Sequence, residues 1–270
     1  MQITFIGGGN MAGALIGGLL AKGVPADAIQ VVEVLHETRS RLAETFGIGC
    51  FERAGDATSL GDLVVLAVKP QQMRAVARDL GRHVGSALVL SIAAGIRLAD
   101  LERWLGGSPV LARCMPNTPA LIGVGATAAY AQPRANASQR AAIQSVLEAV
   151  GAMVWVEEEA LLDPVTALSG SGPAYFFYFI EALEQAGREM GLPAETARVL
   201  AVATARGAGE LAARSSEAPA VLRERVTSKG GTTERALASM SAAGVKDAIV
   251  RAVHAANSRA HELGDEFGRD

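Results

Sequence analysis

The sequence predicts an α/β protein: an N-terminal, doubly wound and largely parallel sheet, followed by an all-α C-terminal domain. Two observations carry this prediction. Short apolar runs alternate with helical segments through the first half of the 270-residue chain, which is typical of a parallel sheet covered by helices on both faces. Beyond Glu159 the β-branched runs stop and alanine-rich helical stretches follow. We therefore expect two domains, residues 1–158 and 159–270.

The composition fits a globular protein and argues against several functions. Half of the residues are hydrophobic, and the formal net charge of −3 argues against a nucleic-acid surface. Two cysteines, Cys50 and Cys114, make neither a disulfide framework nor a metal site. The first strand begins almost at Met1, which leaves no room for a targeting peptide, and no apolar run is long enough for a membrane span. We expect a cytoplasmic protein without metal, membrane or nucleic-acid partners.

The first predicted strand, Ile3–Ile6, leads into the most informative stretch of the chain. Gly7, Gly9 and Ala12 fit the pattern G-x-G-x-x-[G/A], in which small residues let the backbone approach a dinucleotide pyrophosphate. The N-terminus of the following helix then stabilises the anion. Tight packing alone also produces glycine turns, but the position directly after a strand favours a Rossmann-type cofactor site. Its candidate residues are Gly7, Gly9, Asn10 and Met11.

The second predicted strand, Ile29–Val34, carries Glu33 near its end. An acidic residue there accepts hydrogen bonds from the ribose hydroxyls and repels a 2′-phosphate, which favours NAD(H) over NADP(H). An ordinary charged residue at a strand end is the simpler interpretation. His36, Arg39 and Arg41 lie near enough in sequence to offset the repulsion. The sequence therefore leaves both NADPH and NADH open as cofactor.

Five further apolar runs complete the expected sheet. They cover residues 62–68, 87–92, 109–115, 123–130 and 152–156, and a helical segment at 37–46 precedes them.

Two strand ends in this sheet carry further cofactor candidates, because ligands bind at the carboxyl edge of such sheets. The backbone of Ala67, Val68 and Pro70 could line the cofactor, and Lys69 could reach a phosphate or remain solvated. On the next strand, the small residues around Ala94 would let a nicotinamide ring approach, although close helix packing explains them equally well.

A loop follows the fifth predicted run, with the sequence Met115-Pro116-Asn117-Thr118-Pro119. The two prolines remove conformational freedom and hold the polar pair between them in place. Rigid polar groups at a strand's end suit a binding pocket, so Asn117 joins the cofactor-binding candidates. A simple turn is the competing interpretation.

The C-terminal half consists of four predicted helices, at residues 173–190, 194–214, 232–243 and 246–267. The first follows Ser169–Pro173, which can cap it, and contains the aromatic run Tyr175–Phe179. A helix that is apolar all the way round must be buried on every side. Either a partner subunit or the centre of a monomeric domain would bury it, and the sequence favours neither.

The segment Val226–Glu234 places two glycines and two threonines at the start of a helix. Several free N–H groups at the positive helix end form an anion site suited to a small carboxylate. Thr232 or Thr233 could cap the helix, which is the simpler interpretation of this segment, while the other hydroxyl faces the pocket.

Taken together and in this order, these segments resemble pyrroline-5-carboxylate reductase. Residues 67–70 and the glycine turn are shared with related β-hydroxyacid-dehydrogenase-like proteins, whereas residues 115–119, 169–175 and 228–233 are more specific as a set. The resemblance, from residue 3 to about 263, implies reduction of 1-pyrroline-5-carboxylate to L-proline by NADPH or NADH, the last step of proline biosynthesis. It also implies a homodimer through the helical domain, often assembled further into a decamer, with the active site between one subunit's cofactor domain and its partner's helical domain.

The resemblance implies roles for individual residues as well. Gly231 and Thr232 would bind the substrate carboxylate through backbone N–H groups, and Thr233 would be the catalytic residue that hydrogen-bonds the ring nitrogen. Glu159 matches an acidic residue near the substrate, and Glu217 is a plausible second one. The remaining substrate-binding residues, Ser228 and Gly230, would shape the loop.

Three departures from the family pattern bear on these roles. Arg225 stands where some relatives carry asparagine, and Lys229 replaces the commoner proline. No arginine follows Glu33 and Val34 as it does in many NADPH users. Two alternatives remain: another NAD(P)-dependent imine or hydroxy-acid oxidoreductase, which usually needs an acid–base motif that the helical half lacks, and a non-catalytic cofactor sensor, against which the intact carboxylate loop argues.

Overall fold

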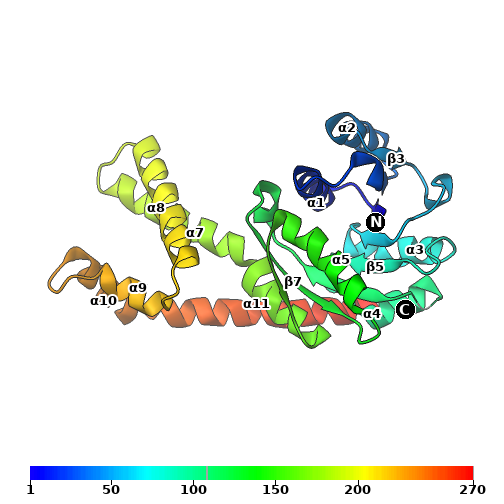
Figure 1. The fold of residues 1–270 in the computed structure, drawn as a ribbon. Coiled ribbons are helices and arrows are strands. Elements are labelled where there is room, and N and C mark those ends of the chain that lie inside the picture. Colours follow the sequence, from blue (N-terminus) through cyan, green and yellow to red (C-terminus); the bar gives the residue numbers. More distant parts are fainter. Residues whose placement is uncertain (108, 270) are drawn as a thin grey trace. The chain divides into compact units, whose positions relative to one another are not determined.

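The computed structural model describes residues 1–107 and 109–269, which form two compact units (Figure 1). The first unit contains the chain up to Ser171 together with the C-terminal stretch from Ala256 onward, and the second contains Gly172–Ala255. The two domains expected from the sequence, residues 1–158 and 159–270, have different bounds from these compact units, and that division stays a prediction.

The first unit is built on an eight-stranded sheet with the strand order β3-β2-β1-β4-β5-β6-β7-β8. All neighbours are parallel except β6 and β7, which are antiparallel. The strands are β1 Ile3–Ile6, β2 Ile29–Val32, β3 Gly49–Phe51, β4 Leu63–Leu66, β5 Leu88–Ser91, β6 Leu111–Met115, β7 Gly125–Ala131 and β8 Gly151–Trp155. This arrangement confirms the predicted fold class.

Six α-helices lie among the described residues of this unit before residue 166, and short 3₁₀ turns occur in several of the connections. They are α1 Asn10–Ala21, α2 His36–Phe46, α3 Pro70–Leu80, α4 Leu98–Leu105, α5 Ala137–Leu147 and α6 Leu162–Val165. A π-helical turn, Thr166–Gly170, follows α6. The crossovers between parallel strands carry α1 to α5 to the two faces of the sheet, as a doubly wound topology requires.

Two hydrophobic clusters, one on each face of the sheet, form the core of the first unit. Phe5 of β1 packs on the face that α1 covers, and Ile6 packs with Met73 of α3 on the other face. Every residue of β1 and β4 is buried. Strands buried on both faces must be apolar throughout, which explains the continuous hydrophobic runs in the sequence.

The second unit is entirely helical. Its helices are α7 Gly172–Glu189, α8 Ala194–Arg214, α9 Pro219–Arg225, α10 Thr232–Ala242 and the first part of α11 Val245–Gly268, whose last turns belong to the first unit. Helices α7 and α8 approach closely at Gly187, where a Cβ atom would lie 3.1 Å from the Cβ of Ala197. The four long helices match their predicted ranges closely, and only α9 was not predicted.

The aromatic run of α7 is not buried within the chain. Phe176, Tyr178 and Phe177 expose 69%, 77% and 59% of their surface. Leaving such large apolar areas in water is unfavourable by about 25 cal/mol per Å². This exposure argues against the alternative of a monomeric domain with α7 buried at its centre.

Candidate functional site

The glycine turn after β1 has a backbone that only glycine adopts readily. Gly7 has a φ of +99°, and a Cβ atom on it would lie 2.8 Å from the carbonyl oxygen of Ala67. Its N–H donates to the carbonyl of Val32 at 2.8 Å. The turn is thereby held against the ends of β2 and β4.

Gly9 shows the opposite environment. It caps α1 without any side-chain capping bond, and a Cβ atom on it would meet nothing within 4 Å. Asn10 and Met11 begin the helix, so their N–H groups have no acceptor within it. An uncapped helix start beside open space fits a phosphate group.

Glu33 lies directly beside this turn. Its carboxylate accepts hydrogen bonds from the N–H of Gly8 at 2.8 Å and from the N–H of Leu35 at 2.9 Å. The structure therefore brings together two predicted elements that lie 25 positions apart in the sequence.

The predicted residues at the end of β4 also reach the turn. Ala67 and Val68 are half-buried and lie against Gly7. Lys69 is exposed and precedes α3, and Pro70 is the first residue of that helix, where its missing N–H costs nothing.

Ala94, at the end of β5, is half-buried. The neighbouring Gly95 has a φ of +72°, and its missing side chain makes room for the last turns of α11, with Phe267 at 3.1 Å and Leu263 at 3.3 Å from an added Cβ. Close helix packing therefore accounts for Gly95, while Ala94 stays a cofactor candidate.

Asn117 connects three segments of the first unit through its side-chain amide. Its Oδ1 accepts from the N–H of Ala126 in β7 at 2.8 Å, and its Nδ2 donates to the carbonyl of Ser169 at 3.1 Å. The side chain of Asn117 is therefore held at both ends of its amide, and the role of the two prolines stays a prediction. These two hydrogen bonds leave a second N–H and a second lone pair of the amide unused.

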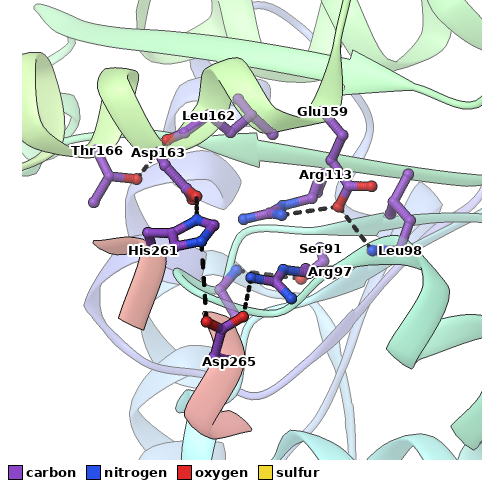
Figure 2. Close-up of polar contacts among 11 residues, drawn as sticks. Ser91, Arg97, Leu98, Arg113, Glu159, Leu162, Asp163, Thr166, His261 and Asp265 are labelled. Carbon is purple, nitrogen blue, oxygen red and sulfur yellow. Dashed lines mark hydrogen bonds and ion pairs between the residues drawn. The ribbon is translucent and has the colours of Figure 1, made fainter. Parts of the chain in front are cut away.

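Figure 2 shows a cluster of charged side chains that the sequence analysis did not anticipate. Arg113 of β6 is buried, and its Nη1 lies 2.8 Å from Oε1 of Glu159. The same oxygen accepts from the N–H of Leu98, the first residue of α4, at 2.8 Å. Glu159 therefore neutralises a buried cation. The signal for this pair in the sequence was Arg113, a charged residue inside an otherwise apolar run.

A second part of this cluster attaches the C-terminal end of α11. Arg97 pairs with Asp265 at 2.6 Å, and His261 lies 3.5 Å from Asp163 (Figure 2). The Arg97 guanidinium holds the pKa of Asp265 below its usual value. These contacts explain why the last turns of this helix belong to the first unit.

The carboxylate-loop candidates lie in the second unit. Gly230 has a φ of +74°, and its N–H donates to Oε2 of Glu234 at 2.7 Å. The N–H of Gly231 donates to the carbonyl of Ser228 at 3.0 Å. The carboxylate of Glu234, a residue not predicted from the sequence to take part, closes the loop.

The start of α10 differs from the expectation in one respect. Gly231, not a threonine, is the N-cap residue, and Thr232 and Thr233 are the first two residues of the helix. The prediction that one threonine caps α10 is therefore wrong. Thr232 is exposed and Thr233 half-buried, and no side-chain hydrogen bond caps the helix.

Arg225, one of the departures from the family pattern, pairs with Glu217 at 2.5 Å. Arg225 ends α9, and the N–H of Glu217 donates to Oγ of Ser215. The arginine therefore has a partner in the segment that precedes α9. The second departure, Lys229, is exposed and nothing in the structure explains it.

A mostly parallel, doubly wound sheet with an open glycine turn beside an acidic strand end, followed by a helical unit, defines an NAD(P)H-dependent oxidoreductase of the Rossmann type. Residues 2–95 match the family described as NADP oxidoreductase, coenzyme F420-dependent, and residues 159–263 match pyrroline-5-carboxylate reductase dimerisation.

Known proteins similar to this chain give the same result over its full length. The pyrroline-5-carboxylate reductase of Pseudomonas aeruginosa is 46% identical over 269 residues, which cover 99% of this chain and 98% of the relative. The one from Pasteurella multocida is 40% identical and covers 98% of both chains. The solved structure of a pyrroline-5-carboxylate reductase from Coxiella burnetii superposes with a TM-score of 0.93 at 37% identity, over 97% of this chain and 98% of that chain. This chain belongs to the pyrroline-5-carboxylate reductase family.

Family membership supplies the activity and the assembly at a general level. The chain reduces 1-pyrroline-5-carboxylate with a nicotinamide hydride donor, in proline biosynthesis. The dimerisation region contains the exposed aromatic run of α7, which supports a homodimer. Within the part of the chain that the structure describes, no helix has the length and apolar character of a membrane span.

Proposed function

We propose that Thr233 orients the imine nitrogen of 1-pyrroline-5-carboxylate while hydride reaches the imine carbon from a nicotinamide bound at the glycine turn. The observation that carries this proposal is the position of Thr233. It lies in the first turn of α10, directly after a loop whose glycines leave helix N–H groups open. A hydroxyl there is adjacent to the groups that hold the substrate carboxylate.

The residues around the glycine turn fit a nicotinamide dinucleotide. The start of α1 at Asn10 and Met11 would hold the pyrophosphate, and Gly9 leaves room for it. Glu33 would meet the adenosine ribose. Toward the nicotinamide, we propose the backbone at Ala67, Val68, Lys69, Pro70, Ala94 and Asn117. The bound cofactor supplies a hydride, NADPH being the family's usual donor and NADH an alternative.

The substrate carboxylate would be held at the start of α10. The N–H groups of Thr232 and Thr233 have no acceptor in the helix, because they belong to its first turn. The N–H groups of Gly230 and Gly231 already bind Glu234 and Ser228. Those internal bonds fix the loop, so that the free N–H groups converge on one anion.

Little acid–base chemistry is required of the protein. A protonated imine is electrophilic at carbon, so orientation of the substrate supplies most of the acceleration. The hydroxyl of Thr233 would hydrogen-bond the imine nitrogen and relay the proton of that nitrogen. Glu159, whose two hydrogen bonds both end on Oε1, would keep Oε2 for a substrate donor. The active site would take its cofactor domain from one subunit and its α10 loop from the partner of a homodimer that can assemble into a decamer.

The cytoplasm is the compartment we propose. Both cysteines, Cys50 and Cys114, are free thiols, as a reducing compartment favours.

Steady-state kinetics with Thr233→Ala test the catalytic role. Losing one positioned hydrogen bond or proton relay should lower kcat/KM for the imine roughly ten- to thousandfold. Thr233→Ser keeps the hydroxyl and should retain most of the activity. Thr232→Ala is the matched control, because it removes a neighbouring hydroxyl and leaves both backbone N–H groups. Equal activities for the Thr233→Ala and wild-type proteins would refute the role.

A further inference from the structure

Three charged side chains near the ends of β2 and β3 bear on which nicotinamide cofactor the chain prefers. They are Glu33, Arg39 of α2 and Glu52, which follows β3. We infer that this triad selects NADH over NADPH, with Glu52 neutralising the guanidinium of Arg39, the cation nearest to Glu33 on α2. The inference rests on the proposed cofactor site at the glycine turn.

Glu33 occupies two backbone donors beside the glycine turn. Its two carboxylate oxygens take the N–H of Gly8, inside the turn, and the N–H of Leu35, which caps α2. A helix start is a favourable place for an anion, and here the protein's own carboxylate fills it. A 2′-phosphate carries a charge of about −1.5 to −2, so it would meet a fixed negative charge instead of free N–H groups.

Arg39 is the nearest candidate to offset that repulsion, and it is already engaged. Its Nη1 donates to the carbonyl oxygens of Glu33 at 2.7 Å and of Val34 at 2.8 Å. Its Nη2 lies 3.0 Å from Oε2 of Glu52, and only 16% of its side chain is exposed. All three contacts direct the guanidinium to the backbone and to β3, where it neutralises Glu52 instead of a ligand.

The other charged groups at the start of α2 do not replace Arg39. His36 and Arg41 are exposed on α2, and Glu37, in the first turn of that helix, adds a negative charge beside them. Exposed charges contribute little in salt-containing water. By contrast, a ribose 2′-hydroxyl can donate directly to the fixed carboxylate of Glu33. Wild-type protein should therefore bind NAD⁺ about tenfold more tightly than NADP⁺.

Glu52 is the positioning residue whose change tests the inference. Glu52→Gln removes the charged partner of Arg39 while the two carbonyl contacts of the guanidinium remain, so an uncompensated positive charge stays beside Glu33. Isothermal titration calorimetry with NAD⁺ and NADP⁺ measures both affinities without turnover. We expect NADP⁺ to bind about two- to fivefold more tightly to this variant, the size of one exposed ion pair, and NAD⁺ to bind unchanged. Glu44→Gln is the matched control, because it removes a charge from the exposed side of α2.

Two further variants separate the charge effect from a loosened fold. Adding Arg39→Gln to Glu52→Gln should abolish the gain in NADP⁺ affinity, because the double variant no longer carries the uncompensated positive charge of Arg39. Glu33→Gln should narrow the preference for NAD⁺ to about threefold or less, because the repulsion disappears. Melting temperatures identify any variant that has lost its structure. The preference of the wild type for NAD⁺ over NADP⁺ should shrink as the salt concentration rises, because salt screens the repulsion.

The outcomes distinguish this inference from the proposed function. Tighter binding of NADP⁺ than of NAD⁺ to the wild type would overturn the inference and leave the cofactor site standing. The same follows if Glu52→Gln and Glu44→Gln change the two affinities alike. Failure of both nucleotides to bind the wild type would overturn the cofactor site itself, and the inference with it.

Discussion

Removing the carboxylate of Glu159 should destabilise the protein by breaking a buried ion pair. Arg113 is 4% exposed, and its Nε, which is buried, has no hydrogen-bond partner among the described residues. In Glu159→Ala the guanidinium would lose its counter-charge while staying in the sheet. Breaking a buried pair from one side costs about 3 to 5 kcal/mol, and the lost acceptor for the Leu98 N–H adds about 1 kcal/mol.

Water reduces the first of these costs. The Glu159 side chain is 27% exposed, so solvent can reach part of the space it leaves. We therefore expect a loss of about 3 kcal/mol in the free energy of unfolding, the lower part of that range. Urea denaturation at one fixed protein concentration measures it, since dimer stability depends on concentration.

Two control variants test whether the loss comes from the unpaired charge of Arg113. Glu158→Ala, one residue earlier and exposed, should change stability by no more than about 0.5 kcal/mol. Replacing both partners by apolar residues, Arg113→Met with Glu159→Leu, should recover most of the loss, because no uncompensated charge remains. A loss under about 1 kcal/mol for Glu159→Ala would refute the account of Arg113 as a buried, neutralised cation.

The remaining predictions concern the glycine turn and the end of α11. Gly7→Ala should destabilise the fold, because the φ of +99° at Gly7 and the Ala67 carbonyl at 2.8 Å leave no space for a Cβ atom. Gly9→Ala should keep the melting temperature of the wild type and weaken NAD⁺ binding in titration calorimetry. Equal melting temperatures for the two variants would contradict this difference. Asp265, whose pKa the Arg97 contact lowers, should stabilise the attachment of α11 above the ordinary pKa of aspartate and lose that effect as pH falls through its lowered value. Hydrogen exchange of the last turns of α11 should show this loss in the wild type and not in Arg97→Gln.

Much of the fold follows from the sequence, and the failures have physical causes. The seven predicted strands are buried apolar runs, and burial on both faces leaves that signal in the residues themselves. Strand β3 was missed because it has only three residues at the sheet edge, one of them Gly49. Helix α9 was missed because its seven residues expose most of their surface and show no apolar face.

The candidate site divides in the same way. The glycine turn and the loop before α10 could be recognised because their backbone conformations require glycine at particular positions, such as Gly7 and Gly230. The capping residue of α10 was misjudged because the preference for threonine at a helix start is weak beside a glycine already in place. Asn117 was predicted to be held rigidly, but its partners in β7 and at Ser169 were beyond local reasoning.

By itself, the sequence determined the doubly wound sheet, the helical second half, the glycine turn and the resemblance to one reductase family. Each of these depends on neighbouring residues or on motifs in a fixed order. Only the tertiary structure decided which charges meet: Arg113 with Glu159, 46 positions apart, and Arg39 with Glu52, 13 positions apart on different elements. Ion pairs depend on distance in space, and that distance is set by how strands and helices pack. The choice between free and engaged cations, on which the cofactor preference depends, therefore belongs to the fold.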